Sequence, residues 1–273
     1  MYKKIDKDNK VLKSEEFQKD KYKFSVLVQN LNSEELELYS DCENYVVCRG
    51  AKKYPTWIWT KDNFDIDLLK ELEEVLELFR LDVDIKCTCK RELYDLLVKD
   101  NYEGLGDYYF EMGYLTCSKT VKPREADGYA TEATRKDKET LVRFLYEGNH
   151  EIKDVAKVTW EQAEENFEKK LEKGNYYVWK NKDDKIVAQA DYKVVENGAK
   201  VAAVYTDPSE RNKGYAANLI YFLTNKALEE GYHVALYTDY EYKPSNKAYK
   251  NCGYVDEDVL INFSCSKVKE KKL

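Results

Sequence analysis

The sequence predicts a two-domain α/β protein, and three observations lead to this fold class. The chain has 273 residues, a length typical of about two domains. Hydrophobic residues make up 43% of the chain and aromatic residues 14%, which is enough apolar material to form a core. Strand-like and helix-like segments also alternate in both halves, as they do in α/β folds.

Composition excludes several functional classes. Asp and Glu (52) outnumber Lys and Arg (45), giving a formal net charge of −7, whereas nucleic-acid binding usually needs a basic surplus. The first residues, MYKKIDKDNKVLKSEEF, lack the apolar segment of a secretory signal, and no apolar run is long enough to span a membrane. We therefore expect a cytoplasmic protein whose partners include neither nucleic acid nor a membrane.

Cysteine and histidine usage argues against a metal site. The seven cysteines are odd in number, and their only close pair, Cys87 and Cys89, fits neither a zinc knuckle nor a C-x-x-C motif. His150 and His233 are the only histidines, which excludes a His-rich site. We expect no metal and reduced, buried cysteines.

The domain boundary is predicted from a polar segment. Residues 119–128, K-T-V-K-P-R-E-A-D-G, carry Pro123 and Gly128 between two stretches that each contain strand and helix signals. This pattern predicts an N-terminal domain over 1–120, a linker over 121–128 and a second domain over 129–273.

Helix-capping signals organise the first part of the second domain. Thr134 is followed by Asp137 and Thr159 by Gln162, and both spacings are typical of a capping box that begins a helix. Glycine then marks the expected helix ends, at 148 and 174. The predicted elements are a strand over 129–134, a helix over 134–147 and a helix over 159–171.

Strand signals dominate the next part. Asn197-Gly198 is a strong hairpin signal between two of three strand-like runs. Apolar residues then recur at helical spacing between Gly214 and Glu230, and we expect the strands on either side of that helix to be parallel neighbours. The predicted elements are strands over 176–180, 186–195, 200–206 and 233–238, a helix over 214–230, a helix over 245–251 and a strand over 254–265.

The first half of the chain resembles a degenerate copy of this order of strands and helices. The strand W-I-W-T at 57–60 corresponds to V-Y-T at 204–206 and is followed by a helix over 66–80, a strand over 83–89 and a helix over 91–99. Met112-Gly113-Tyr114 then precedes a strand, as Cys252-Gly253-Tyr254 does. Either an old duplication or two unrelated α/β halves explains this pattern.

The loop R-N-K-G-Y-A at 211–216 is the strongest chemical signal. It connects a strand to an amphipathic helix, where free amides and the helix dipole favour an anion. Gly214 allows a phosphate close to the backbone, Ala216 keeps the next turn small, and Arg211 and Lys213 add positive charge. An ordinary βα loop with basic surface residues is the alternative, but the flanking strand and helix favour the anion site.

The segment V-Y-T-D-P-S-E-R-N-K-G-Y-A resembles the acetyl-CoA-binding segment of the GNAT superfamily of N-acyltransferases, whose signature is [RQ]-x-x-G-x-[GA]. Residues 245–254, S-N-K-A-Y-K-N-C-G-Y, are similar to the second half of that site. The resemblance covers roughly residues 129–265. It implies a GNAT fold, a mixed central sheet flanked by helices, with a second, smaller α/β domain and a tandem GNAT arrangement if the halves are duplicates.

The resemblance also implies a role for each matching residue. The strands over 200–206 and 233–238 would splay apart, with the acyl group between them. A backbone amide of the first of these strands would stabilise the oxyanion. Four candidate bases, Asp191, Glu196, Asp207 and Asp239, leave the general base unassigned, and water is a further alternative. The implied cofactor-binding residues are Val204, Tyr205 and Thr206 for the pantetheine arm, Arg211, Asn212, Lys213, Gly214, Tyr215 and Ala216 for the pyrophosphate, and Asn246 for the pantetheine side, with Tyr249 as the catalytic acid.

The resemblance therefore implies an N-acetyltransferase that uses acetyl-CoA as co-substrate and transfers acetyl to a primary amine. The acceptor is a small molecule or a peptide, and the acidic chain slightly favours a cationic one. The N-terminal domain would not bind CoA, because K-D-N-F-D-I-D after W-I-W-T has neither the arginine nor the glycine. The alternative function is a non-catalytic CoA-binding sensor or interaction module, and a homodimer stays open.

Overall fold

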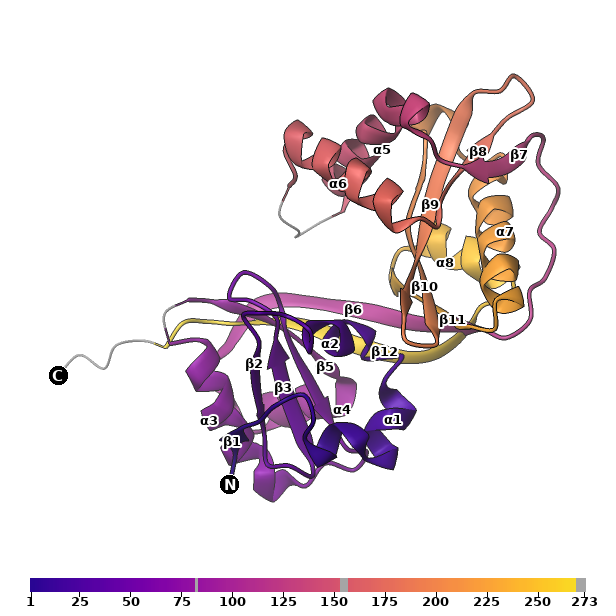
Figure 1. Ribbon diagram of the computed structural model, residues 1–273. Helices are drawn as coiled ribbons and strands as arrows, with labels where there is room; N and C mark the ends of the chain where they lie inside the picture. The colour runs from indigo at the N-terminus through magenta and orange to yellow at the C-terminus, as the bar shows by residue number, and fades with distance from the viewer. Residues whose placement is uncertain (82, 153–156, 269–273) are drawn as a thin grey trace. The chain divides into compact units, whose positions relative to one another are not determined.

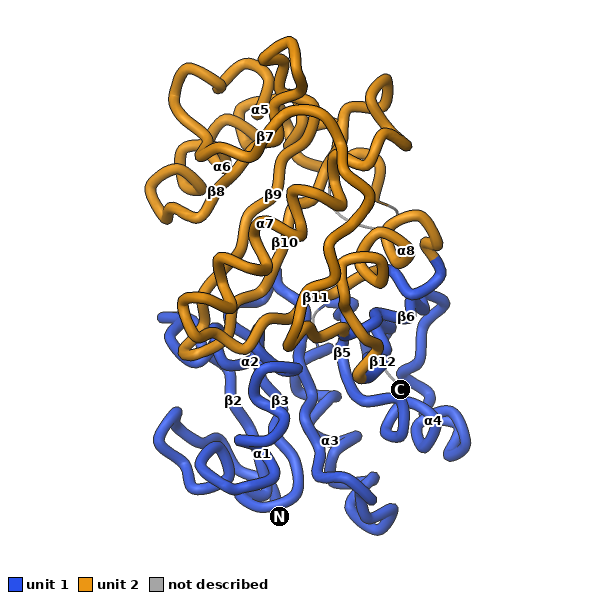
Figure 2. The backbone as a smooth tube through the Cα atoms, turned by 90° about the vertical axis from the view of Figure 1, so that its right-hand side faces the viewer, with its two compact units in different colours: residues 1–114, 239–241, 258–273 blue, residues 115–238, 242–257 orange. Residues whose placement is uncertain are grey.

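The structure is a computed structural model that describes residues 1–81, 83–152 and 157–268. The chain divides into two compact units, shown in Figure 2. Unit 1 comprises residues 1–114, 239–241 and those from 258 onward, and unit 2 comprises 115–238 and 242–257. Each unit holds strands of a mixed sheet flanked by helices, so the predicted α/β class is confirmed.

The sheet of unit 1 is mixed. The antiparallel pairs are β1 (Lys3–Lys4) with β2 (Glu37–Ser40), β2 with β3 (Tyr45–Arg49), β3 with β4 (Thr56–Thr60), and β5 (Ile85–Lys90) with β12 (Val255–Cys265). The strands β4 and β5 are parallel and are joined through the helix α3 (Leu69–Phe79). A short 3₁₀ turn, Ile66–Leu68, precedes α3. In spatial order the strands are β1 (Lys3–Lys4), β2 (Glu37–Ser40), β3 (Tyr45–Arg49), β4 (Thr56–Thr60), β5 (Ile85–Lys90), β12 (Val255–Cys265) and β6 (Leu105–Cys117).

Helices cover both faces of this sheet. The short helices α1 (Glu15–Asp20) and α2 (Ser25–Asn30), preceded by a 3₁₀ turn at Lys10–Lys13, pack aromatic rings against β4. The Phe17 ring lies 5.2 Å from Trp59 and the Phe24 ring 6.1 Å from Trp57, both edge-on. The helices α3 and α4 (Arg91–Lys99) share the core on the other face.

The last strand of the chain belongs largely to unit 1. Residues 260–265 of β12 pair with β5, from Leu260 opposite Lys90 to Cys265 opposite Ile85. Ile261 and Phe263 are buried in the same core as α3 and α4. The units therefore differ from the expected domain of residues 129–273, because the alternating apolar residues of 258–265 are buried in the first core.

Unit 2 also has a mixed sheet, seen in Figure 1. The strands β10 (Gly198–Thr206) and β11 (His233–Asp239) are parallel, as predicted, and the other neighbours are antiparallel. The helices α5 (Lys138–Glu151) and α6 (Trp160–Lys173) pack on one face, and α7 (Tyr215–Glu229) and α8 (Lys243–Asn251) on the other. In spatial order the strands are β11 (His233–Asp239), β10 (Gly198–Thr206), β9 (Ile186–Val195), β8 (Tyr176–Lys180) and β7 (Tyr129–Glu132), and the helices are α5 (Lys138–Glu151), α6 (Trp160–Lys173), α7 (Tyr215–Glu229) and α8 (Lys243–Asn251), with 3₁₀ turns at Arg135–Asp137 and Pro208–Glu210.

Several local predictions are confirmed, and two differ in detail. The Thr159–Gln162 capping box is formed, and α6 ends at Gly174. The helix α5 continues past Gly148, however, because this glycine serves packing: a Cβ there would lie 3.0 Å from the ring of Tyr205. The hairpin turn lies one residue earlier than predicted, since Gly198 already pairs in β10.

The segment expected as a linker is packed into unit 2. The Val121 amide donates to the carbonyl of Cys252 at 3.0 Å, and Asn218 Nδ2 donates to the carbonyl of Arg124 at 2.9 Å. These bonds attach residues 121–128 to α7 and to the end of α8. The polar composition of the segment reflects backbone hydrogen bonding to the domain rather than a free connection.

All seven cysteines are buried and none forms a disulfide, as predicted. None of the described helices is long and apolar enough to cross a membrane.

Candidate functional site

The predicted site begins where β10 and β11 stop pairing. Their parallel register runs from Gly198 opposite His233 to Val201 opposite Leu236. In the described chain no later residue of β10 pairs with β11, although β10 continues to Thr206. The register with β9 also shifts after Ala202, where Ala203 has a φ of +52° and forms a bulge. This end of β10 is therefore open to an added extended chain along the edge that faces β11.

Gly214 begins α7 and shapes its anion site. It has φ +91° and ψ 0°, and it caps the helix without a side-chain hydrogen bond to the first-turn amides. Asn218 Nδ2 donates to the carbonyl of Gly214 at 3.0 Å and so braces the loop from inside the helix. The uncapped amides at the start of this 15-residue helix suit a phosphate group.

The two basic residues of the loop are held by carboxylates. The Arg211 guanidinium donates to both oxygens of Glu151 at 2.7 Å, and its Nε donates to the Thr206 carbonyl at 3.1 Å. Lys213 pairs with Glu210 at 2.7 Å. A pyrophosphate at this loop would compete with Glu151 for Arg211. The sequence did not indicate this partner, because Glu151 lies sixty residues away at the end of α5.

Two tyrosines among the predicted cofactor residues have packed side chains. The Tyr205 hydroxyl donates to Glu147 at 2.9 Å, and its ring lies 5.1 Å from that of Phe144. The Tyr215 hydroxyl donates to Asp127 at 2.7 Å, a bond that raises the pKa of Tyr215 to about 12. Only the backbone of these residues is left to contact a cofactor.

The structure also places three further residues that were predicted to bind the cofactor, one on β10 and two in or after the loop. Val204 and Ala216 are partly buried against the core shared by α7 and α8. Asn212 has a φ of +65°, a conformation that asparagine tolerates better than most residues. Val204 and Ala216 again offer the backbone rather than the side chain, whereas Asn212 is exposed.

Tyr249 lies in α8, within the core that also contains Tyr215. Its exposed fraction is 8%, and its ring lies 6.1 Å from that of Tyr254 in an edge-on arrangement. Burial raises the pKa of Tyr249 to about 12, so its hydroxyl is neutral and can donate a proton. Asn246 lies three residues earlier in α8, which places both residues on the same side of the helix.

Asp207 is unsuited to act as the general base. One oxygen accepts a bond from Arg143 at 2.9 Å, and the other accepts from the amide and hydroxyl of Ser209. Although burial opposes the effect, the Arg143 and Ser209 bonds lower the pKa of Asp207 to about 2. A carboxylate of this acidity is a poor proton acceptor near neutral pH.

The other candidate bases occupy different settings. Asp191 is buried on β9 and pairs with Lys170 of α6. Glu196 lies in the exposed hairpin turn, and Asp239 accepts the Glu241 amide at 2.9 Å. Of the four, Asp191 has the most enclosed carboxylate.

In unit 1, side chains of the unit itself occupy the place beside the end of β5 and the loop after β4. Lys90, at the end of β5, pairs with Asp20 at 2.6 Å and with Asp62 at 2.7 Å. The Trp59 indole also donates to Asp20 at 2.9 Å. Asp20 also pairs with Lys23 at 3.0 Å, so the carboxylates and lysines here neutralise one another. The expectation that this unit does not bind CoA stays a prediction.

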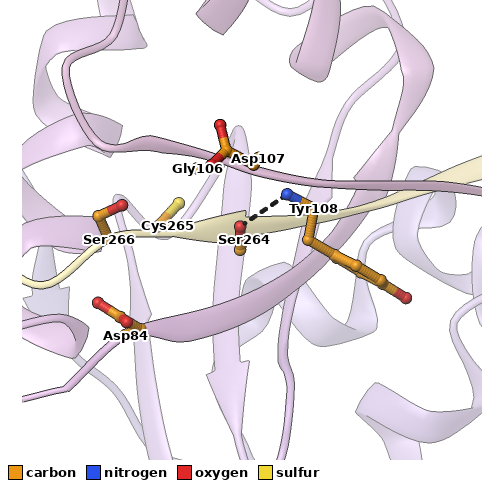
Figure 3. A pocket seen from close by; sticks show the side chains of 7 residues that line it. All are labelled: Asp84, Gly106, Asp107, Tyr108, Ser264, Cys265 and Ser266. Atoms are coloured by element: carbon orange, nitrogen blue, oxygen red, sulfur yellow. Dashed lines mark hydrogen bonds between the residues drawn. The ribbon is translucent and has the colours of Figure 1, made fainter. Parts of the chain in front are cut away.

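Unit 1 also has a polar pocket of about 270 Å³, shown in Figure 3. It lies between the start of β6 and the end of β12, where the Tyr108 amide donates to Ser264 Oγ at 3.2 Å. Asp84 accepts the Lys267 amide at 2.5 Å. None of the predicted site residues lines it; the lining residues are Asp84, Gly106, Asp107, Tyr108, Ser264, Cys265 and Ser266.

Comparisons with known proteins agree with this fold. Residues 140–254 match the model of the acetyltransferase (GNAT) family. A GNAT-family acetyltransferase from Colwellia psychrerythraea has a similar structure over 97% of this chain and 100% of its own, with a TM-score of 0.63 and 12% identity. A GCN5-related N-acetyltransferase from Kribbella flavida matches over 91% and 94%, with a TM-score of 0.62 and 15% identity. These likenesses show a shared fold that includes unit 1, and no curated protein sequence matches the chain.

Proposed function

Because residues 140–254 belong to the GNAT family of acetyltransferases, we propose that this chain transfers acetyl from acetyl-CoA to a primary amine. The proposal rests on the connection between the end of β10 and the start of α7. There a strand that has left its parallel neighbour is followed within eight residues by an uncapped helix start at Gly214. The two features fit the extended arm and the phosphates of one cofactor.

Binding would use the backbone more than side chains. The pantetheine arm would pair with residues 204–206 as an added strand, and the pyrophosphate would accept the first-turn amides of α7. Arg211 would contribute its charge after the phosphates displace Glu151. Asn246, in the first turns of α8, would face the pantetheine arm.

The reaction would be a direct acyl transfer. The neutral amine attacks the thioester carbonyl, a C–N bond forms, the C–S bond breaks, and the CoA sulfur leaves as thiolate. A backbone amide at the β10 bulge would stabilise the oxyanion, and Tyr249 would give its proton to the thiolate. The proton lost by the amine passes to water or to a base.

Two measurements on the full chain test this function. Calorimetric titration with acetyl-CoA should show micromolar binding, and release of free thiol should follow when one class of amine is added. Arg211→Glu should weaken binding strongly, because it places a negative charge beside the phosphates. Unchanged affinity of this variant would overturn the loop assignment. Binding without thiol release for any amine would favour the sensor alternative.

A further inference from the structure

A polar cluster occupies one face of the unit 2 sheet, on the side covered by α5 and α6. Asp191 and Lys193 lie on β9, and Lys200 lies on β10 directly opposite Lys193. Their neighbours Ala190, Tyr192, Ala199 and Val201 are buried in the core on the opposite face. Because side chains alternate along a strand, the three charged residues share the α5 and α6 face.

Asp191 leaves one oxygen of its carboxylate unused. Its exposed fraction is 4%, and Oδ2 pairs with Lys170 of α6. Oδ1 is buried and has no hydrogen-bond partner among the residues that the structure describes. A buried acceptor without a partner is costly, so a ligand that brings an N–H group to this oxygen would be favoured.

The cluster is cationic in an acidic protein. Lys170, Lys193 and Lys200 outnumber Asp191, whereas the whole chain has a net charge of −7. Burial and the charge of Lys193 lower the pKa of Lys200 to about 8, against the opposing effect of Asp191. Lys193 and Lys200 are directly opposite each other, and like charges in that position repel. An anionic ligand beside them would be attracted to both ammonium groups.

The cluster also lies next to the proposed reaction centre. Lys200 is one residue before Val201, where the pairing of β10 with β11 ends. Its ammonium lies 4.7 Å from the centre of the Tyr237 ring on β11, so the charged face reaches both separating strands. If acetyl-CoA binds as proposed, its thioester would lie beside this face.

We propose that this cluster binds the acceptor, and that the acceptor is a small molecule carrying an anionic group as well as its primary amine, as an amino acid does. Lys193 and Lys200 bind the anionic group, and Asp191 Oδ1 accepts an N–H from the acceptor. The inference rests on the proposed function, and it replaces the preference for a cationic acceptor that net charge alone indicated. The charge that acts on the acceptor is the local positive charge of Lys193 and Lys200, rather than the net charge of the whole chain.

The test compares acceptors that differ in one group. Thiol release is measured with 4-aminobutyrate, butylamine, 1,4-diaminobutane and 3-aminopropyl phosphate, and binding of each is measured by calorimetry in the presence of CoA. We expect 4-aminobutyrate or the phosphate to have a KM at least about tenfold lower than butylamine, since hydrogen bonds to charged groups contribute about 1.5–3 kcal/mol. Comparison of the carboxylate with the phosphate identifies the anion. Preference for butylamine or the diamine would overturn the inference.

Variants at Lys193 localise the effect. Lys193 is exposed enough to change without loss of the fold. Lys193→Gln should raise the KM of the anionic acceptor and leave the KM of acetyl-CoA unchanged, and Lys193→Glu should shift preference toward the diamine. Lys182→Gln, in the exposed turn between β8 and β9, is the matched control and should behave as the parent. Equal behaviour of the Lys193 and Lys182 variants would refute the assignment.

The proposed function and this inference fail in different ways. Anionic amines that bind with CoA but release no thiol would overturn acetyl transfer and support the acceptor site. Thiol release with uncharged amines alone would support acetyl transfer and overturn the acceptor site.

Discussion

Replacing Gly214 with alanine changes the loop by a single methyl group. The residue has φ +91° and ψ 0°, and a Cβ there would meet no atom closer than 3.7 Å. Crowding therefore contributes little, and the cost comes from the left-handed backbone, at roughly 1–2 kcal/mol for a residue other than glycine.

This cost should appear mainly in cofactor binding. If the loop leaves the left-handed conformation to relieve the strain, the amides of α7 move away from the phosphates. A loss of 1–2 kcal/mol corresponds to acetyl-CoA binding weaker by about 5- to 30-fold. Calorimetric titration measures the affinity, and thermal unfolding of the same samples measures the stability.

Gly231 provides the matched control at the other end of α7. It has a φ of +84°, and no atom of a described residue outside its immediate neighbours in the chain lies within 4 Å of its Cβ position. Gly231→Ala should lower the unfolding temperature by a few degrees, about 2–4 °C per kcal/mol, and leave acetyl-CoA affinity unchanged. If the two variants lose equal stability and neither loses affinity, then the start of α7 does not bind the pyrophosphate.

Four further changes have defined outcomes. Tyr249→Phe should lower kcat about 100-fold or more with little effect on acetyl-CoA affinity, and an unchanged rate of thiol release would remove Tyr249 as the acid. Glu151→Gln should tighten acetyl-CoA binding about 1.4- to 5-fold, because partly exposed ion pairs contribute about 0.2–1 kcal/mol, and the gain should shrink in high salt. Asp207 has a pKa lowered to about 2, so its stabilising effect is complete above pH 4 and is lost as the pH falls toward 2. Urea unfolding of Asp207→Asn should lack that acid-side loss, and parallel pH profiles would contradict this reasoning. Deletion of residues 258–273 should unfold unit 1, because each large apolar side chain that it removes contributes roughly 1.5–3 kcal/mol, and native-like near-UV circular dichroism would argue otherwise.

Sequence analysis succeeded where a structure depends on neighbouring residues. The helix α6 begins at a capping box whose two members are three residues apart, and α7 begins at a glycine that follows a strand. The parallel pair β10 and β11 follows from the crossover helix between them. For the same reason the loop over 211–216 and the helix that follows it could be located from a dozen consecutive residues, while the role of this loop in cofactor binding stays a prediction.

Features that depend on distant residues were not predicted. Glu151 engages Arg211 and Arg143 engages Asp207 across about 60 residues of sequence. The short helices α1 and α2 have six residues each, which is too few for a clear apolar period. Their stability comes from packing on the sheet, α1 on β4 and α2 on β3. The alternation at 258–265 indicated a strand but could not indicate which core would bury it.

The position of β12 has a consequence for biosynthesis. On the ribosome, β5 is complete about 170 residues before its neighbour β12, an interval of roughly 9–35 s at ordinary rates of translation. During that time β5 has a bare edge, and β6 has already been made and is free to pair with it wrongly. The final strand must then enter between β5 and β6. The nascent chain should therefore depend on chaperones until β12 has been synthesised, and slow translation should increase its aggregation.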